Sequence, residues 1–429
     1  MKNRFIILFI ILAVFGGIGA LLFFGRQDDG AQFSGTLNVW GVFDDPAVFV
    51  PIIEAYKARY PKSKFEIAYT KLDPVIYEQQ LIDALAAGSG PDVFMFHNTW
   101  LPKHYNKVMP LGNEATQLAA FTNLYPTVVQ QDFAPDQIIY GYPLYVDTLA
   151  TYYNQDTFDA KGISLPPKTW TDLEGVIPRV REMDKAGRIT KAAAALGGSN
   201  KSINRATDIL SLLMLQSGTK MTDDEFRNAT FDSAEGDAAL AYYTKFANAR
   251  DSAYTWNDSL SYSLDSFAAG ETAVMFNYSH QVAFLKNKSP FLKFRVVPML
   301  QPLGATSEVN FANYWGLVVS NKSANPLLAA DFIKYLTADI DGSRKYLELS
   351  GRVPALRTLI NEYISTKPDL GLFAKQALTA RSWPEVDNNA IESIFTGVIT
   401  DVNGGRATID RALSEAASKV TDLMQRRAR

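Results

Sequence analysis

The chain has no cysteine among its 429 residues. Without thiols it can form no disulfide, no thiolate zinc site and no iron–sulfur cluster, and it has neither a cysteine nucleophile nor a cysteine for N-terminal lipidation. Histidine is almost as scarce, because only His97, His104 and His280 are present. Three histidines are too few for a histidine-built metal site. We therefore expect no bound metal and no other cofactor.

An excess of positive charge is also missing. The formal net charge is −3, and three of the basic residues, Lys2, Arg4 and Arg26, precede the main body of the chain. A net acidic body is not attracted to DNA or anionic lipid, so nucleic acid is excluded as a partner. The sequence also lacks the Gly-x-Ser-x-Gly, His-Glu-x-x-His and Walker motifs, so the commonest hydrolase, metalloprotease and nucleotide sites are not indicated.

The residues that are present suit a folded protein of more than one domain. Hydrophobic residues make up 47% and charged residues 20%, which is the composition of a soluble protein with sizeable cores. The length predicts two to three domains. Twenty tyrosines and six tryptophans supply flat amphipathic rings, which suit both protein cores and the faces of sugars.

The N-terminus carries an uncharged run, Phe5 to Phe24, directly after Lys2 and Arg4. As a helix this run would span about 30 Å, the thickness of a hydrocarbon core. We predict a single-pass signal anchor over residues 1–26, a polar tether over residues 27–35, and the bulk of the chain outside the cell membrane. Three glycines in the run weaken the helix, so a cleaved signal peptide remains an alternative.

From Thr36 onward, short apolar runs alternate with helical patterns, which is typical of α/β proteins with mostly parallel sheets. Strands are predicted at Leu37–Val42, Phe65–Tyr69, Asp92–Phe96, Ala150–Tyr153, Ala273–Phe276, Phe294–Val297 and Trp315–Val319. Helices are predicted at Tyr77–Ala87, Ala206–Leu215, Ala234–Ala247, around Val48–Tyr56 and Leu328–Leu336, and near the C-terminus from Ile409 to Leu423. The helix-rich centre, about Asp156 to Asp265, indicates a second lobe.

Six fragments of the body stand in an ordered series: LNVWGVFDDP, ALAAGSGPDVFMFHNTW, GYPLYVDTLATYYNQDTF, FAAGETAVMFN, NYWGLVVSNKSANPLLAADFIKYLTA and SGRVPA. Together they resemble the family 1 extracellular solute-binding proteins of ABC importers, the group that includes maltose-binding protein. The resemblance runs from Thr36 nearly to Met424. Each fragment is weak alone, but six in the family's order are hard to obtain by chance.

This resemblance implies a two-lobed α/β fold, of the type II periplasmic-binding-protein-like class, that closes around ligand by hinge bending. The chain would cross between the lobes near Leu149, near Pro298 and near Leu336 to Asp339. The expected lobes are residues 36–149 and 299–336 for lobe 1, and residues 150–298 and 337–429 for lobe 2.

The resemblance also implies a set of ligand-binding positions. In the first part of the chain they are Phe43, Asp44, Asp45, Asn98, Thr99, Trp100, Tyr145 and Asp147. Further along they are Tyr278, His280, Asn313, Trp315, Arg352 and Trp383. Amides, hydroxyls and carboxylates in such a cleft would hydrogen-bond a sugar, and aromatic rings would stack on it. His280 stands where the maltose-binding relative has a stacking aromatic, which argues against maltose itself as the ligand.

Several of these residues have a structural alternative. Asp44 or Asp45 can cap the helix that begins at the following proline. The others with a packing or surface alternative are Trp100, His280, Trp315, Arg352 and Trp383. In the segment GGSNKSINR, Asn200 and Asn204 can either donate hydrogen bonds to a ligand or cap a helix.

The function implied by the resemblance is a monomeric, membrane-anchored receptor. It would capture a small solute, expected to be a sugar or oligosaccharide, and deliver it to the permease subunits of an ABC importer. An extracellular glycoside hydrolase is the alternative, since Asp44, Asp45 and Asp147 could supply two carboxylates about 5–10 Å apart. A surface sensor or adhesin without a permease is a third possibility, because a fold does not fix its function.

Overall fold

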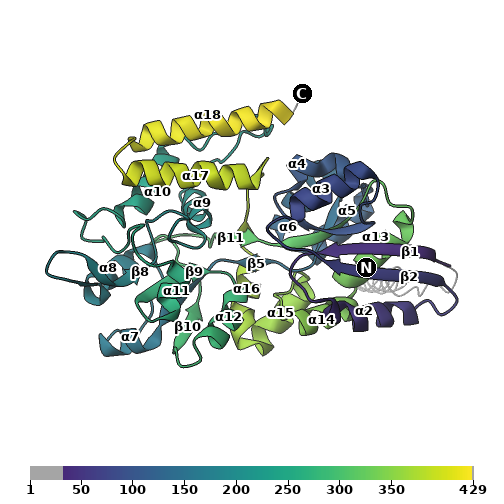
Figure 1. The fold of residues 1–429 in the computed structure, drawn as a ribbon, viewed down its shortest axis with the longest axis horizontal. Helices are drawn as coiled ribbons and strands as arrows, with labels where there is room; N and C mark the ends of the chain where they lie inside the picture. The colour runs from purple at the N-terminus through teal and green to yellow at the C-terminus, as the bar shows by residue number, and fades with distance from the viewer. Residues whose placement is uncertain (1–31, 428–429) are drawn as a thin grey trace, which may run out of the picture.

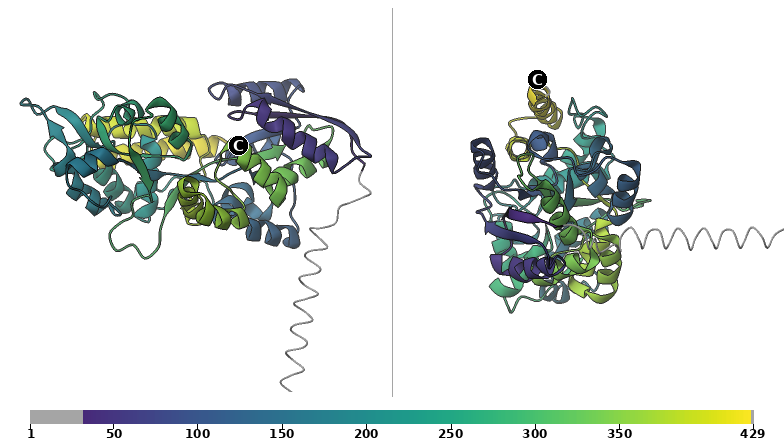
Figure 2. Two further views of the ribbon diagram at one scale, coloured as in Figure 1. Left: turned by 90° about the horizontal axis from the view of Figure 1, so that it is seen from below. Right: turned by 90° about the vertical axis from the view of Figure 1, so that its right-hand side faces the viewer.

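The computed structural model describes residues 32–427. The predicted anchor, residues 1–26, and residues 27–31 of the predicted tether lie outside this range. Within it, no helix is both long enough and apolar enough to cross a membrane. The described chain forms two lobes that lie next to each other along the long axis, joined by short segments in the middle (Figure 1). The view along this axis in Figure 2 shows the lobes one behind the other.

The first lobe is built on a five-stranded sheet of order β2-β1-β3-β12-β4. Its strands are β1 (Ser34–Gly41), β2 (Lys64–Lys71), β3 (Val93–His97), β4 (Gly141–Pro143) and β12 (Trp315–Val319). Its helices are α2 (Pro46–Ala58), α3 (Tyr77–Ala87), α4 (Leu101–His104), α5 (Ala115–Leu124), α6 (Thr127–Phe133), α13 (Pro326–Thr337) and α14 (Ile340–Ser350), with the 3-10 helices η1 (Tyr105–Lys107) and η2 (Pro135–Gln137). Every side chain of β3 is buried, so this strand runs through the centre of the lobe.

The second lobe has its own five-stranded sheet, of order β10-β6-β9-β8-β7. Its strands are β6 (Ala150–Asn154), β7 (Glu182–Met183), β8 (Ile189–Ala194), β9 (Thr272–Asn277) and β10 (Phe294–Val297). Its helices are α7 (Gln155–Ala160), α8 (Trp170–Val180), α9 (Ala206–Gln216), α10 (Ala234–Lys245), α11 (Ser263–Ala268), α12 (His280–Lys288), α17 (Asn388–Asn403) and α18 (Ile409–Arg427). Figure 1 shows α17 and α18 lying together along one side of this lobe.

A small three-stranded sheet joins the lobes. It has the order β13-β11-β5 and consists of β5 (Asp147–Thr148), β11 (Asn310–Asn313) and β13 (Ala380–Arg381). The helices α15 (Arg357–Thr366) and α16 (Pro368–Ala377) lie beside it. Gln376 ties α16 to the junction, because its side-chain amide donates to the Thr148 hydroxyl and to the Leu149 carbonyl, both at 2.9 Å.

Two of the three passages between the lobes lie further along the chain than we expected. The first is at β5, next to Leu149. The second is at β11 and not near Pro298, because Gln301 still pairs with Thr169 at the start of α8 in the second lobe. The third follows α14, which packs on α2 and α13 of the first lobe although its residues were assigned to lobe 2. Short junction strands have too few residues to leave a pattern in the sequence, which is why these boundaries were misplaced.

The predicted elements are confirmed to within a few residues, but the expectation of mostly parallel sheets is wrong. Only the pairs β1 with β2, β1 with β3 and β8 with β9 are parallel within the two large sheets, and the other five pairs are antiparallel. The reason is that the chain passes between the two lobes three times. β12 enters the first sheet from the other lobe, so no helical crossover imposes a parallel direction on it.

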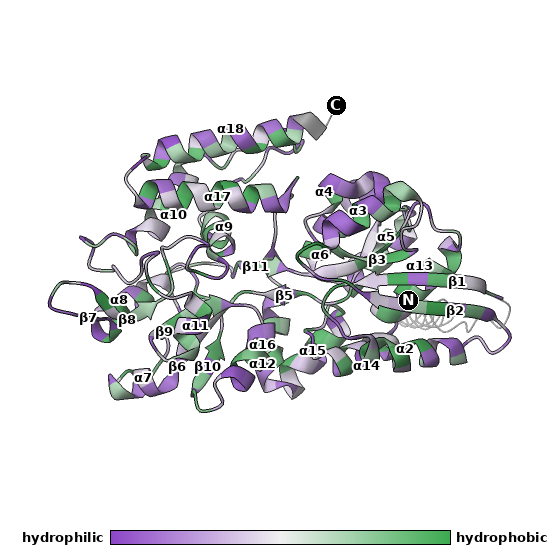
Figure 3. Ribbon diagram, in the orientation of Figure 1, coloured by the Kyte–Doolittle hydropathy of each residue, from purple (hydrophilic) through white to green (hydrophobic). Residues whose placement is uncertain are grey.

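Local signals explain where the helices begin and end. Asp45 caps α2 by accepting a hydrogen bond from the Ala47 amide at 2.9 Å, and Pro46 occupies the first helical position. Helix α3 ends at Gly88, whose φ of 75° is the left-handed conformation that glycine adopts without strain. Hydrophobic and hydrophilic residues alternate along α18 (Figure 3), and Leu413 and Val420 on its apolar side are fully buried.

Candidate ligand-binding cleft

Two neighbouring hollows lie between the lobes. The first, called here the Trp315 hollow, has a volume of about 280 Å³. Its lining includes Phe43, His97, Asn98, Thr99, Asn313 and Trp315 on one side and Arg205, Asp208, Glu385, Asn388, Asn389 and Glu392 on the other. The second, the His280 hollow, has a volume of about 600 Å³, and His280, Lys286, Ser350, Arg352, Lys367 and Asp369 are among its lining residues.

The first-lobe wall of the Trp315 hollow comes from the end of β3 and from β11. His97 holds this wall together, because its Nδ1 lies 2.8 Å from the Thr99 hydroxyl and its Nε2 lies 3.1 Å from the Asn313 amide oxygen. Burial lowers the pKa of His97 to about 4, so the ring is neutral at pH 7. Asn98 donates through its amide to the buried carboxylate of Asp132 at 3.0 Å. Hydroxyl and amide groups are thereby fixed at the cavity wall.

Aromatic rings line the same side. Trp315 is half-buried and meets the Phe43 ring edge to face, with 5.4 Å between the ring centroids. Trp100 packs behind Trp315 at 5.0 Å, and its indole Nε1 donates to Asn388 at 3.0 Å. Trp100 is 5% exposed and is not among the residues that line the hollow, a packed position as in its structural alternative.

The opposite wall carries three carboxylates and one guanidinium. Asp208 lies on α9, Glu385 precedes α17, and Glu392 lies within α17. Burial raises the pKa of all three, and their mutual repulsion adds to the rise for Glu385 and Glu392, while Arg205 opposes it for Asp208 and Glu392. The hydroxyl of Tyr278 donates to Asp208 at 2.6 Å.

Tyr278 separates the two hollows. The Arg205 guanidinium, in the lining of the Trp315 hollow, lies 5.6 Å from the centre of the Tyr278 ring. His280, in the lining of the other hollow, stacks on the same ring with a centroid distance of 6.2 Å and an interplanar angle of 13°. Tyr278 itself is buried and lines neither hollow, but it contacts one lining residue of each.

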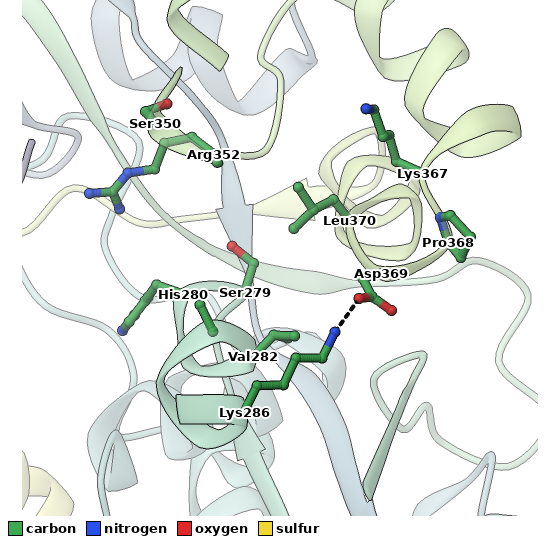
Figure 4. Close-up of a pocket in the computed structure, with 12 residues that line it drawn as sticks. Ser279, His280, Val282, Lys286, Ser350, Arg352, Lys367, Pro368, Asp369 and Leu370 are labelled. Carbon is green, nitrogen blue, oxygen red and sulfur yellow. Dashed lines mark hydrogen bonds and ion pairs between the residues drawn. The ribbon is translucent and has the colours of Figure 1, made fainter. Parts of the chain in front are cut away.

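The His280 hollow is shown in Figure 4. His280 and Lys286 project from α12, Arg352 approaches from the segment after α14, and Asp369 comes from α16. Most of its charges are paired within the protein. Lys286 binds Asp369 at 2.6 Å, and Arg352 binds Asp44 at 3.2 Å.

Asp44, Tyr145 and Asp147 have structural partners in this region. Asp44 is buried and also accepts from the Tyr346 hydroxyl at 2.8 Å. The guanidinium of Arg352 lies 4.8 Å from the centre of the buried Tyr145 ring. Asp147 accepts from the Ser279 hydroxyl at 2.7 Å and from its backbone amide.

The structure therefore divides the fourteen predicted positions into three groups. Phe43, Asn98, Thr99, Asn313 and Trp315 line the Trp315 hollow, and His280 and Arg352 line the His280 hollow. Asp44, Trp100, Tyr145, Asp147 and Tyr278 pack directly behind these walls. Asp45 caps α2, and Trp383 is 2% exposed and stacks on Phe395, so these two lie in neither lining.

Sequence reasoning missed the polar wall of the second lobe. Asn200 and Asn204 were considered, but Arg205 beside them is the residue that lines the hollow. Glu385, Asn388, Asn389 and Glu392 were not considered, although Asn388 and Asn389 lie one turn before Glu392 on the same face of α17 and Glu385 shortly precedes them. That cluster of polar residues around the start of an amphipathic helix is the signal that could have found them.

The residues of the cleft do not form a metal site. Among residues 32–427, no group of three or more histidine, aspartate or glutamate side chains could hold a metal ion. The arrangement instead offers rings, amides, hydroxyls and charges around a cavity, which is the lining of a small-molecule site.

Known proteins resemble this chain in sequence and in fold. The maltodextrin-binding protein MdxE of Bacillus subtilis is 22% identical over 383 residues, which cover 86% of each protein. The sugar-binding protein MalE of Xanthomonas citri has the same fold, with a TM-score of 0.75 at 20% identity over 92% of this chain and 98% of that one. The cyclic α-maltosyl-1,6-maltose binding protein of Arthrobacter globiformis also matches, with a TM-score of 0.75 at 18% identity over 91% and 99% of the two chains.

A family model gives the broader assignment. The model described as bacterial extracellular solute-binding protein matches residues 52–370, well over half of the chain. The protein therefore belongs to the family of bacterial extracellular solute-binding proteins and is a binding protein rather than an enzyme.

Proposed function

We propose that the protein captures a carbohydrate between its lobes and delivers it to the permease of an ABC importer. The observation that carries this proposal is the Trp315 hollow, where aromatic rings and fixed hydrogen-bonding groups share one interlobe cavity. An indole ring gives a sugar face an apolar surface, and the amides and hydroxyls match its hydroxyl groups. MdxE is named for maltodextrin and the Arthrobacter globiformis protein for cyclic α-maltosyl-1,6-maltose, and both names support the same ligand class.

Within this function, the residues that contact ligand would be Phe43, Asn98, Thr99, Asn313 and Trp315. His280 and Arg352 would contact a ligand long enough to reach the second hollow, and the buried Tyr278 would support His280 from behind. Three further predicted positions would hold these residues in place: Asp44 holds Arg352, Asp147 holds Ser279 next to His280, and Trp100 supports Trp315.

Anchoring and delivery belong to the same proposal. The apolar run Phe5–Phe24 would hold the protein in the cell membrane as a single span, with the lobes outside and next to the permease. Cell fractionation tests this part. The full-length protein should remain in the membrane fraction after washing at high pH, and deletion of residues 1–26 should release it; a wild-type protein found in the washed supernatant would contradict the anchor.

Ligand capture is tested by titrating the full-length protein with a panel of mono- and oligosaccharides. Because Trp315 lines the cavity and Trp100 packs on it, binding should change the tryptophan fluorescence and raise the melting temperature. Amino acids, polyamines and inorganic anions serve as comparison ligands. If one of these binds and no sugar does, the carbohydrate assignment is wrong.

A further inference from the structure

The lining of the Trp315 hollow has more acidic than basic side chains. Its lining holds the carboxylates of Asp208, Glu385 and Glu392 but only one cationic side chain, that of Arg205. His97 is neutral at pH 7 and adds no positive charge. A neutral sugar can hydrogen-bond a carboxylate but cannot compensate its charge, which is costly to keep away from water.

Two of the three carboxylates have partners within the protein, and one does not. Asp208 accepts from the Tyr278 hydroxyl at 2.6 Å, and Glu392 accepts from the Asn200 amide at 2.6 Å. Glu385 accepts no hydrogen bond and forms no ion pair with any residue in the range 32–427. It is partly buried, and the other two carboxylates raise its pKa together with burial. Its environment is therefore short of one positive charge or donor.

The guanidinium of Arg205 is a second group with neither a hydrogen bond nor an ion pair among the described residues, although it lies over the Tyr278 ring and near Asp208 and Glu392. Its Nε is enclosed and makes no hydrogen bond, and within the described range its other nitrogens form no ion pair either. Arg205 also has a φ of 67°, a left-handed conformation that arginine rarely adopts, so the fold holds this residue at the cavity wall. A guanidinium with free donors needs acceptor oxygens.

Because Glu385 and Arg205 both lack a hydrogen bond and an ion pair within the described chain, we propose that the ligand of the Trp315 hollow is an amino sugar, whose protonated amine binds Glu385 while its hydroxyls accept from Arg205. This inference rests on the proposed function, because it specifies which carbohydrate that cavity takes. The ammonium group is preferred to a metal ion because the acidic residues do not converge into a metal-binding group within residues 32–427. Trp315 and Phe43 on the opposite wall would receive the face of the sugar ring.

The test compares sugars that differ only in the amine. Calorimetric titration of the full-length protein uses glucosamine with glucose, galactosamine with galactose, mannosamine with mannose, and chitosan disaccharide with cellobiose. In at least one pair the amino sugar should bind about tenfold more tightly or better, the effect of a charge-assisted hydrogen bond in a desolvated site. Glu385→Gln should bring that ratio close to one, whereas Glu54→Gln, at an exposed position of α2 outside both hollows, should leave it unchanged.

Each outcome decides between the two proposals. Neutral sugars that bind as tightly as their amino partners would overturn the amino-sugar inference and leave carbohydrate capture intact. The same holds if Glu385→Gln, checked by an unchanged melting temperature, retains the preference. The comparison of sugar pairs uses the wild-type protein, so it remains decisive if the variant does not fold. Failure of every sugar to bind would count against both proposals.

Discussion

The two hollows of the cleft differ in how their charges are compensated. In the His280 hollow, Lys286 and Arg352 each have an acidic partner within 3.2 Å. In the Trp315 hollow, neither Arg205 nor Glu385 forms an ion pair with any of the described residues. Charges that are already paired gain little from a ligand, whereas unpaired groups in a partly dry cavity gain a partner on binding. We therefore expect binding energy to be concentrated in the smaller hollow, although the other has about twice its volume.

The largest effect expected is on affinity when the aromatic wall is removed. Trp315→Ala should weaken the binding of a cognate sugar roughly a hundredfold or more, because central aromatic residues contribute about 2–4 kcal/mol when truncated. His280→Ala, in the other hollow, should weaken it less. Calorimetry on both variants measures the difference. An equal loss of affinity in both variants would remove the distinction between the hollows. Trp383→Phe is the control, because Trp383 is an aromatic residue packed outside both hollows.

The second effect concerns the pH dependence of stability and is expected at Asp132, which lies beneath the wall of the Trp315 hollow. Its carboxylate accepts from Asn98, Tyr314 and Ser382, yet burial outweighs these bonds and raises its pKa to about 6. The native state therefore binds this proton more tightly than the unfolded chain does, for which the value is 3.8. The contribution of Asp132 to stability is largest below pH 3.8 and is lost as the pH rises through about 6.

Asp132→Asn isolates this effect, because the amide does not titrate. Urea unfolding of both proteins at pH 4 and at pH 7 gives the measurement. The free energy of unfolding of the wild type, relative to the variant, should fall by roughly 2–3 kcal/mol between the two pH values. The same relative stability at both pH values would show that the carboxylate titrates normally.

Local structure was predictable where the sequence carries its own boundary signals. Helix α3 was placed at Tyr77–Ala87, as observed, because a left-handed glycine follows it. The junction was not predictable, since β5 and β13 are two residues long and show no periodicity. The direction of β12 was also hidden, because it depends on the chain returning from the other lobe.

The lining of the Trp315 hollow was predictable on one side only. Asn98, Thr99 and Trp315 belong to segments that directly follow or begin strands of the first sheet, where polar and aromatic residues stand out against apolar neighbours. Arg205 and Glu385 lie far from them in the sequence and reach the same cavity only because the lobes meet. Their missing partners are a property of packing in three dimensions, which no local pattern records.

A smaller effect is expected at the rim of the Trp315 hollow, where charges connect the lobes. Lys103 on α4 lies 2.8 Å from Glu78 of the first lobe and 2.8 Å from Asp387, the residue that caps α17 in the second. Lys103→Met should favour the open arrangement and weaken ligand binding about fivefold, the effect of a partly exposed ion pair worth about 1 kcal/mol.

Calorimetry and small-angle scattering of the unliganded protein check this prediction, and a larger radius of gyration should accompany the weaker binding. Lys57→Met is the matched control, because Lys57 pairs with Glu66 within the first lobe at 2.6 Å. If both lysine variants bind ligand equally well, the contact at Lys103 does not influence closure.

The smallest effect separates two adjacent carboxylates, Asp44 and Asp45. Asp45 caps α2 and touches neither hollow, so Asp45→Ala should cost about 1 kcal/mol of stability and lower the melting temperature by about 1–3 °C, with ligand affinity unchanged. Asp44→Asn should instead weaken binding of any ligand that reaches the His280 hollow, because it removes the charge that holds Arg352. Melting curves and calorimetry on both variants distinguish the two roles. If Asp45→Ala loses as much affinity as Asp44→Asn, the capping residue also contacts ligand.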